Sequence, residues 1–164
     1  MDFLAALLFL QAAEKKLADL PDGAQLTRHW FAVDGSSAGF AAQKGDAVTL
    51  VNAGVTLEPF DDRGPLTISP DGKHVAYAGS REGKWFVARD KERAGPYDRV
   101  DAIAWSPDSA RLAWAARTAE GVSAFLDGAA TAPCDGITGL AFTPDNKELV
   151  YIAAKEAAFT AVVG

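Results

Sequence analysis

Cysteine and histidine are scarce in this sequence of 164 residues, and their scarcity limits its chemistry. The single cysteine, Cys134, excludes an internal disulfide. The two histidines, His29 and His74, have no cysteine or histidine neighbour at the spacing of a zinc site, so no metal is expected. Neither a Gly-x-Gly-x-x-Gly nor a Walker sequence occurs, so no nucleotide cofactor is expected either.

Basic clusters and long apolar runs are also missing. The chain carries 22 acidic and 16 basic residues, a net charge of −6, and its longest basic cluster is the pair Lys15-Lys16. A phosphate-binding surface needs a basic stripe, so nucleic acid is not an expected partner. The apolar run at residues 3–10 is too short to cross a bilayer, and no membrane span is predicted.

Residues 1–23 differ from the rest of the chain and are interpreted as an N-terminal apolar leader or helix. Their apolar run has the length of a signal-peptide core and precedes small residues, but Asp2 stands where Lys or Arg is usual. The alternative is an amphipathic helix that ends at Pro21-Asp22-Gly23. A periplasmic or secreted location and a cytoplasmic one therefore both stay open.

A tetrapeptide recurs at a spacing of 37 residues, as Ser69-Pro70-Asp71-Gly72, Ser106-Pro107-Asp108-Ser109 and Thr143-Pro144-Asp145-Asn146. One further step back reaches Ala32-Val33-Asp34-Gly35, which keeps only the Asp-Gly. Pro at the second position and Asp, Gly or Asn at the last two suit a tight turn. A fixed period of this length indicates units that bury their apolar faces by stacking on one another.

Apolar, strand-like runs flank each turn. The run after the turn carries an aromatic residue in the same register of every copy, at Phe40, Tyr77, Trp114 and Tyr151. Side chains alternate across a strand, so Val75 and Tyr77 face one side while Ala76 and Ala78 face the other. One face is bulky and the other small, which suits a sheet that nests between two neighbouring sheets.

A third apolar run and a polar stretch complete each copy. The polar stretches, at residues 60–62, 97–100 and 134–137, are expected to form short outer strands. Four short strands in about 40 residues are typical of a propeller blade. The predicted fold class is all-β: a β-propeller or partial propeller of about four 37-residue, four-stranded blades over residues 24–164. The copies start near residues 30, 67, 104 and 141, and the last is incomplete.

With these turns, the Val-Ala-Tyr and Leu-Ala-Trp runs after them, and Leu126-Asp127-Gly128, the chain resembles the WD-like repeats of TolB-type β-propellers. It is also similar to the propeller halves of prolyl-oligopeptidase-type peptidases. The resemblance covers about residues 30–164 and departs from the pattern at Ala32-Val33. It implies a fold more specifically than a function, because such propellers have many unrelated roles.

Residues 24–29 fall at the repeat phase assigned to the outer strand, which the fourth copy lacks at its end. We therefore expect Leu26 to pair with the strand around residues 159–163, which would close a ring of four blades and hide a sheet edge. Two alternatives stay open. Two chains could join in a homodimer with a ring of about eight blades, or the sequence could be the front part of a longer propeller.

Ser69 and Ser106 stand close to Asp71 and Asp108, which is the combination of a nucleophile and a carboxylate. They recur at the turns, however, and turn hydrogen bonds account for the hydroxyl and the carboxylate there. Cys134 takes the repeat position of Phe60 and Tyr97 and is interpreted as a small residue in a buried slot. No catalytic residue is predicted, and the protein is not expected to be an enzyme.

Residues that do not repeat are the candidates for function, because a propeller keeps its framework and varies its loops. The loops between second and third strands and those that enter each first strand are expected on one face. Their charged members are proposed as binding residues: Arg63, Arg81, Lys84, Arg99, Asp101 and Arg117. Such a face suits an acidic peptide or protein partner. The predicted function is a non-catalytic protein-binding or peptide-binding platform. The alternatives are the propeller portion of a larger enzyme, such as a prolyl-oligopeptidase-type peptidase, and a self-assembling structural unit.

Overall fold

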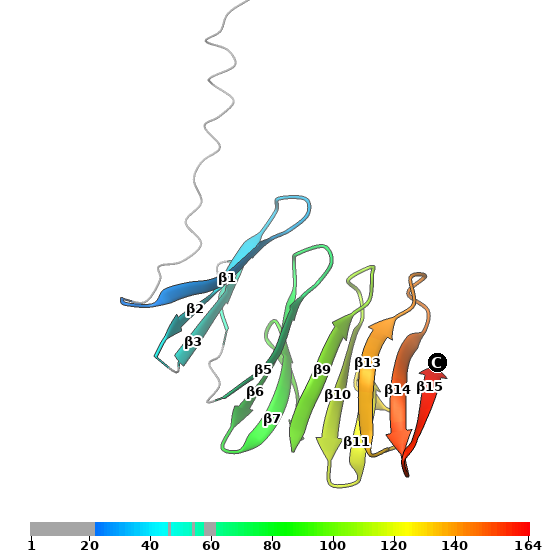
Figure 1. Cartoon of the computed structure of the whole chain (residues 1–164). Coiled ribbons are helices and arrows are strands. Elements are labelled where there is room, and N and C mark those ends of the chain that lie inside the picture. Colours follow the sequence, from blue (N-terminus) through cyan, green and yellow to red (C-terminus); the bar gives the residue numbers. More distant parts are fainter. Residues whose placement is uncertain (1–21, 46, 54, 58–61) are drawn as a thin grey trace, which may run out of the picture.

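The computed structural model describes residues 22–45, 47–53, 55–57 and 62–164. Over these ranges the chain forms antiparallel sheets stacked in a row and contains no helix (Figure 1). The all-β prediction is therefore confirmed. The predicted leader or helix at residues 1–23 lies almost wholly outside the described residues.

Four sheets, numbered here as blades, follow one another along the chain. Blade 1 contains β1 (Gln25–Phe31), β2 (Ala38–Lys44), β3 (Ala47–Asn52) and β4 (Val55–Thr56). Blade 2 contains β5 (Asp62–Ile68), β6 (Val75–Arg81), β7 (Lys84–Arg89) and β8 (Glu92–Tyr97). Blade 3 contains β9 (Arg99–Trp105), β10 (Leu112–Thr118), β11 (Gly121–Leu126) and β12 (Ala129–Ala130). Blade 4 contains β13 (Gly136–Phe142), β14 (Leu149–Lys155) and β15 (Ala158–Val163).

The recurring tetrapeptide forms the turn between the first and second strands. The Ser69 hydroxyl donates to the Asp71 carboxylate over 2.5 Å and accepts from the His74 backbone N–H over 2.9 Å. Ser106 makes the same pair of bonds in blade 3, and Thr143 makes them in blade 4. The hydroxyls are thus committed to the turn, as the sequence predicts.

The fourth residue of each turn has a positive φ, which is 75° at Gly72, 65° at Ser109 and 64° at Asn146. Glycine is required only at the first of these positions. A Cβ on Gly72 would fall on the Phe31 carbonyl oxygen of blade 1, whereas Ser109 and Asn146 have room for side chains. Those two side chains reach back to the preceding blade, where they accept hydrogen bonds from the backbone N–H of Asp71 and Asp108 respectively.

Each blade packs its bulky face into the small face of the blade before it. Trp114 of blade 3 lies in one buried cluster with Ala76 and Ala78 of blade 2. Tyr77 of blade 2 lies with Ala41 of blade 1 in a second cluster. A third cluster holds Tyr151 of blade 4 and Ala113 of blade 3. The alternation of large and small residues along the second strand therefore builds three successive seams, as predicted.

The predicted closure through Leu26 is wrong. Leu26 pairs with Ala42, and β1 is the first strand of blade 1. The seven residues of β1 take the same repeat positions as those of β5, the first strand of blade 2. β15 lies at the edge of the blade 4 sheet. A strand of this length, which buries Trp30 between sheets, gains more from its own blade than from an outer position.

The outer strands also lie earlier in each repeat than predicted. In blade 2 the outer strand is β8, so the stretch at residues 97–100 covers its last residue and the beginning of β9. In blade 3 it is the two-residue β12, and residues 134–137 form an isolated bridge from Cys134 to Val122 followed by β13. Most of the stretch at residues 60–62 lies outside the described residues.

Candidate functional site

The stacked blades present two ends. The turn end carries the tetrapeptide turns together with the β7–β8 and β11–β12 turns. The loop end carries the β6–β7 and β10–β11 turns and the segments that enter β5, β9 and β13 (Figure 1). The candidate binding residues predicted from the sequence belong to the loop end.

A repeated clasp occupies the turn end. His74 contacts Asp90 over 2.7 Å and lies against Trp105 of the next blade, with tilted ring planes and ring centroids 5.9 Å apart. One repeat later, Arg111 pairs with Asp127 over 3.0 Å and lies 5.9 Å from the Phe142 ring of the next blade. Because an arginine performs the same contacts, His74 has a structural role. The two histidines do not meet, since His29 contacts Phe31 on β1.

The turn carboxylates are held in their ionised form. The Ser69 hydroxyl lowers the pKa of Asp71, and the Ser106 hydroxyl lowers that of Asp108. The Thr143 hydroxyl does the same for Asp145. In blade 1, which lacks the hydroxyl, the hydrogen-bonded Lys73 ammonium lowers the pKa of Asp34 instead, across an ion pair of 2.7 Å. These carboxylates therefore serve the turns and carry no feature of a catalytic acid.

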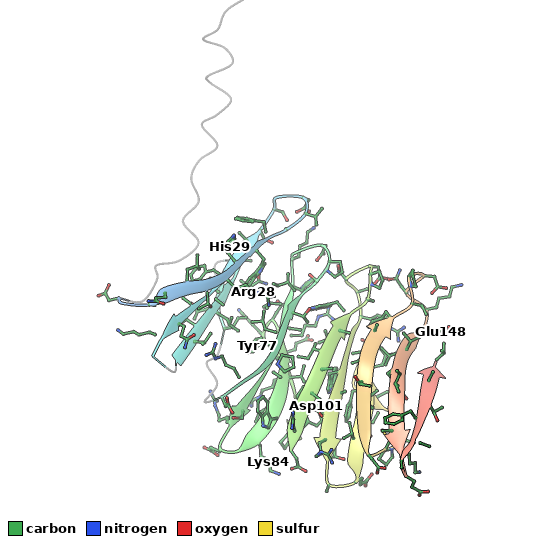
Figure 2. All side chains as sticks on the ribbon, in the orientation of Figure 1. Arg28, His29, Tyr77, Lys84, Asp101 and Glu148 are labelled. Carbon is green, nitrogen blue, oxygen red and sulfur yellow. The ribbon has the colours of Figure 1, made fainter. Side chains whose placement is uncertain are left out.

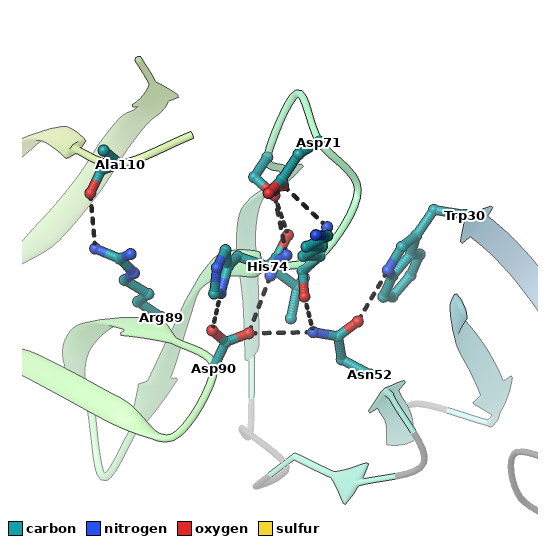
Figure 3. Close-up of polar contacts among 10 residues, drawn as sticks. Trp30, Asn52, Asp71, His74, Arg89, Asp90 and Ala110 are labelled. Carbon is teal, nitrogen blue, oxygen red and sulfur yellow. Dashed lines mark hydrogen bonds and ion pairs between the residues drawn. The ribbon is translucent and has the colours of Figure 1, made fainter. Parts of the chain in front are cut away.

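A polar bridge joins blades 1 and 2 at the turn end (Figure 3). The Asn52 side chain, 6% exposed, accepts from the Trp30 indole N–H over 3.1 Å. It donates to the Lys73 carbonyl over 2.9 Å and to the Asp90 carboxylate over 3.2 Å. One repeat later Arg89 reaches the equivalent carbonyl, that of Ala110, over 3.3 Å. Asn52 was not predicted from the sequence, because the amide does not recur at the repeat spacing.

Most of the predicted binding residues at the loop end have partners, and Figure 2 labels two of the six, Lys84 and Asp101. Lys84 pairs with Asp98 over 2.7 Å, and Arg99 pairs with Asp101 over 2.6 Å. Arg117 donates to the Asp135 carbonyl over 3.2 Å and lines a mixed-charge cavity of about 360 Å³ with Glu120 and Lys155. Arg81 also has an interaction within the protein. These contacts give five of the six residues an interaction within the protein, and their role in binding a partner stays a prediction.

Arg63 stands apart from the other five. No carboxylate among the described residues pairs with its guanidinium, and it lines a cavity of about 280 Å³ between blades 1 and 2. Apolar side chains from both blades form its wall, including Ala41, Val48, Leu50 and Leu66. Arg28 of β1 contributes the second charge, and it donates to the Leu66 carbonyl over 3.2 Å. Among the described residues, all the charge that lines this cavity is positive, and we call it the arginine cavity.

Arg28 was not predicted from the sequence, because residues 24–29 were assigned to the far end of the molecule. Two overlapping cavities of about 590 and 560 Å³ open at the turn end of the same seam, and both are lined by Asp90, Lys91 and Glu92. Charges of both signs line them, unlike the arginine cavity. The seam between blades 1 and 2 is therefore hollow at both ends.

Within the described part of the chain, no three His, Cys, Asp or Glu side chains converge in a way that could hold a metal ion. The described residues also include no helix with the length and apolarity needed to cross a membrane. The Cys134 thiol is partly buried and donates to the carbonyls of Val122 and Gly136, each over 3.2 Å. It therefore has a structural setting, close to the one predicted.

Successive antiparallel sheets of three or four strands, stacked face to face, define this chain as part of a β-propeller. The fold is TolB-like. TolB from Acinetobacter baumannii matches with a TM-score of 0.53 and 12% identity, over 85% of this chain and 40% of that one. A TolB candidate from Agrobacterium tumefaciens matches with a TM-score of 0.45 and 14% identity, over 90% of this chain and 60% of that one.

Hydrazine synthase from Kuenenia stuttgartiensis matches with a TM-score of 0.43 and 18% identity, over 94% of this chain and 48% of that one. This chain thus spans less than two thirds of each of these structures. No family model and no curated protein matches the sequence. The likeness establishes the fold, and the function has to be argued from the chain's own residues.

Proposed function

We propose that this protein is a non-catalytic propeller module that binds an acidic, partly apolar segment of a protein or peptide. The observation that carries the proposal is the arginine cavity between blades 1 and 2. Its apolar wall suits a leucine-sized or phenylalanine-sized side chain, and Arg28 and Arg63 suit a neighbouring carboxylate. The chain's net charge of −6 makes this local positive site distinctive.

The absence of a catalytic role is proposed from what the nucleophile candidates already do. The hydroxyls of Ser69 and Ser106 are bonded within their turns. His74 is held by Asp90, 16 residues further along the chain, in a clasp that recurs without a histidine in blade 3. A serine nucleophile needs a free hydroxyl beside a base, and neither serine has one.

Binding can be measured by fluorescence anisotropy with a labelled peptide that alternates glutamate and leucine. A peptide that alternates lysine and leucine serves as the control probe. We expect saturable binding of the acidic peptide only, and its affinity should fall as salt rises because the contacts are exposed ion pairs. Equal binding of both peptides, or of neither, would contradict the proposal.

Variants locate the site. Arg63→Ala and Arg28→Ala should each weaken binding of the acidic peptide about tenfold, the loss of one charge-assisted contact. Arg99→Ala is the matched control, because Arg99 lies at the same end but pairs with Asp101 and does not line the cavity. If Arg99→Ala weakened binding as much as Arg63→Ala, the peptide would bind the loop end generally and not the cavity.

A further inference from the structure

The two arginines of the arginine cavity stand at repeat positions that hold no charge in the other blades. The positions that correspond to Arg63 at the spacing of 37 residues hold Leu26, Val100 and Ile137. The positions that correspond to Arg28 hold Pro65, Ala102 and Gly139. Neither guanidinium therefore belongs to the framework that the blades share.

The position of Arg63 is an apolar packing position in the other two seams. Val100 is 3% exposed and belongs to the buried cluster between blades 2 and 3. Ile137 packs against the cluster between blades 3 and 4. Between blades 1 and 2 the same position carries an exposed arginine beside the cavity. Positions at which a sequence departs from the packing rule of its own fold are expected to be functional ones.

Both guanidinium groups keep N–H donors for a ligand. Arg28 donates through Nη1 to the Leu66 carbonyl over 3.2 Å, which uses only part of its planar fork of donors. Arg63 is bonded to the Asp62 carboxylate through its backbone N–H, over 2.7 Å, and its guanidinium has no hydrogen-bond partner among the described residues. Such forks match the two oxygens of a carboxylate.

The size of the cavity limits which carboxylate can accompany an apolar side chain. At about 280 Å³ the cavity is smaller than most ligand pockets, which have about 300–1,000 Å³, and it suits a single residue. In an extended peptide, adjacent side chains point to opposite sides, and those two residues apart are separated by about 6.6 Å. A glutamate next to a bound leucine would therefore point away. A C-terminal residue carries its α-carboxylate and its side chain on the same Cα atom.

We propose that the arginine cavity binds the C-terminal residue of a protein or peptide. The large apolar side chain of that residue lies against the wall of Ala41, Val48 and Leu50, and its α-carboxylate is held by Arg28 and Arg63. This inference rests on the proposed function and specifies which part of the bound segment enters the cavity.

Two labelled peptides of equal net charge test the proposal by fluorescence anisotropy. The first alternates glutamate and leucine and ends in leucine with a free carboxylate. The second ends in the leucine amide and carries one additional glutamate at its amino end. We expect the amide to bind about tenfold more weakly, since it lacks the charge-assisted contact. Equal affinities would overturn the inference and leave the proposed binding of an acidic segment intact, whereas binding of neither peptide would contradict both.

The last side chain of the peptide is tested separately. Replacing the final leucine of the free-acid peptide by serine should weaken binding about tenfold, because the apolar wall then loses its contact. The same replacement at the first leucine is the matched control and should have little effect. If the two replacements weakened binding equally, the cavity would not select the C-terminal residue.

Variants assign the effect to the cavity. Arg63→Val and Arg28→Ala install the residues that blade 3 carries at these positions, Val100 and Ala102. Each should remove most of the difference in affinity between the acid and the amide, and circular dichroism checks that each is folded. Arg99→Ala should keep the full difference, since Arg99 pairs with Asp101 outside the cavity. If both cavity variants kept the full difference, the α-carboxylate would bind elsewhere and the inference would be wrong.

Discussion

The seam between blades 1 and 2 and the seam between blades 2 and 3 follow one packing rule and differ in how completely it is met. Between blades 2 and 3, Trp114 stacks on Phe125 with ring centroids 5.5 Å apart, and Tyr97 lies 5.0 Å from the same phenylalanine. Between blades 1 and 2, the position of Phe125 is held by Ala88. Ala88 and Tyr77 line one of the turn-end cavities there.

The difference shows that a repeat can keep its fold while the filling of its seams varies. The seam between blades 2 and 3, called the filled seam, is packed by aromatic rings, and a cavity of about 310 Å³ lined by Trp114 lies beside them. The seam between blades 1 and 2, called the hollow seam, has larger cavities and adds to its apolar cluster the polar bonds of Asn52 and the ion pair between Lys73 and Asp34. In Figure 1 the first strand of blade 1 stands apart from β5, whereas β5, β9 and β13 lie side by side.

The largest effect is expected from removing the aromatic core of the filled seam. Trp114→Ala should lower the free energy of unfolding by about 3–5 kcal/mol, because the indole is buried among rings that cannot close around the space it leaves. Tyr77→Ala, at the same repeat position of the hollow seam, should cost about 2 kcal/mol. Urea denaturation followed by circular dichroism measures both. Equal losses would remove the contrast between the seams.

The second largest loss in the free energy of unfolding is expected from removing the polar bridge between blades 1 and 2. Asn52→Ala leaves the buried Trp30 indole N–H without its acceptor and should cost about 1–3 kcal/mol. Gln43→Ala is the control, since the Gln43 amide is exposed and, among the described residues, bonds to the nearby Gly45 carbonyl over 2.8 Å. If both changes had the same small effect in urea denaturation, Asn52 would not hold the hollow seam together.

Filling the hollow seam should stabilise it. Ala88→Phe restores the ring that blade 3 carries at Phe125, and we expect a gain of about 1 kcal/mol in the free energy of unfolding. The matched control is Ala124→Phe, at a position that is 0% exposed in blade 3, where the added ring should cost about 1–3 kcal/mol. A loss of stability with Ala88→Phe would show that the seam has no room for a ring.

The smallest effect concerns acid. The pKa of Asp34 is lowered in the folded chain by the hydrogen-bonded Lys73 ammonium. An aspartate with a lowered folded pKa contributes stability above its unfolded pKa of about 3.9, and that contribution is lost as the pH falls toward the folded value. Asp34→Asn should therefore reduce the loss of thermal stability below about pH 4. An unchanged slope of melting temperature against pH would contradict this.

The sequence predicted the blades because their period is carried by residues that the packing cannot do without. The turn hydroxyls and the large-small alternation of the second strand recur at 37 residues, and each recurrence constrains the next sheet. Outer strands were misplaced because two-residue strands such as β4 and β12 leave almost no pattern. The paired charges at Lys84 and Arg99 could not be anticipated, because ion pairs depend on side-chain positions and not on spacing.

Arg28 and Asn52 were missed for a related reason. Both act across the seam between blades 1 and 2, where blade 1 departs from the repeat. Once residues 24–29 were assigned to an outer strand, Arg28 was placed far from Arg63, although both line one cavity. The assignment of residues 24–29 therefore failed in blade 1, where the sequence departs from the repeat.

The nesting of each bulky face in the small face of the preceding sheet is tested most directly by proton–proton nuclear Overhauser effects in the folded protein. Because Trp114 shares a buried cluster with Ala76 and Ala78, we expect cross-peaks between the Trp114 indole protons and both alanine methyl groups. Cross-peaks from the Trp114 ring that were confined to residues of its own sheet would contradict this packing.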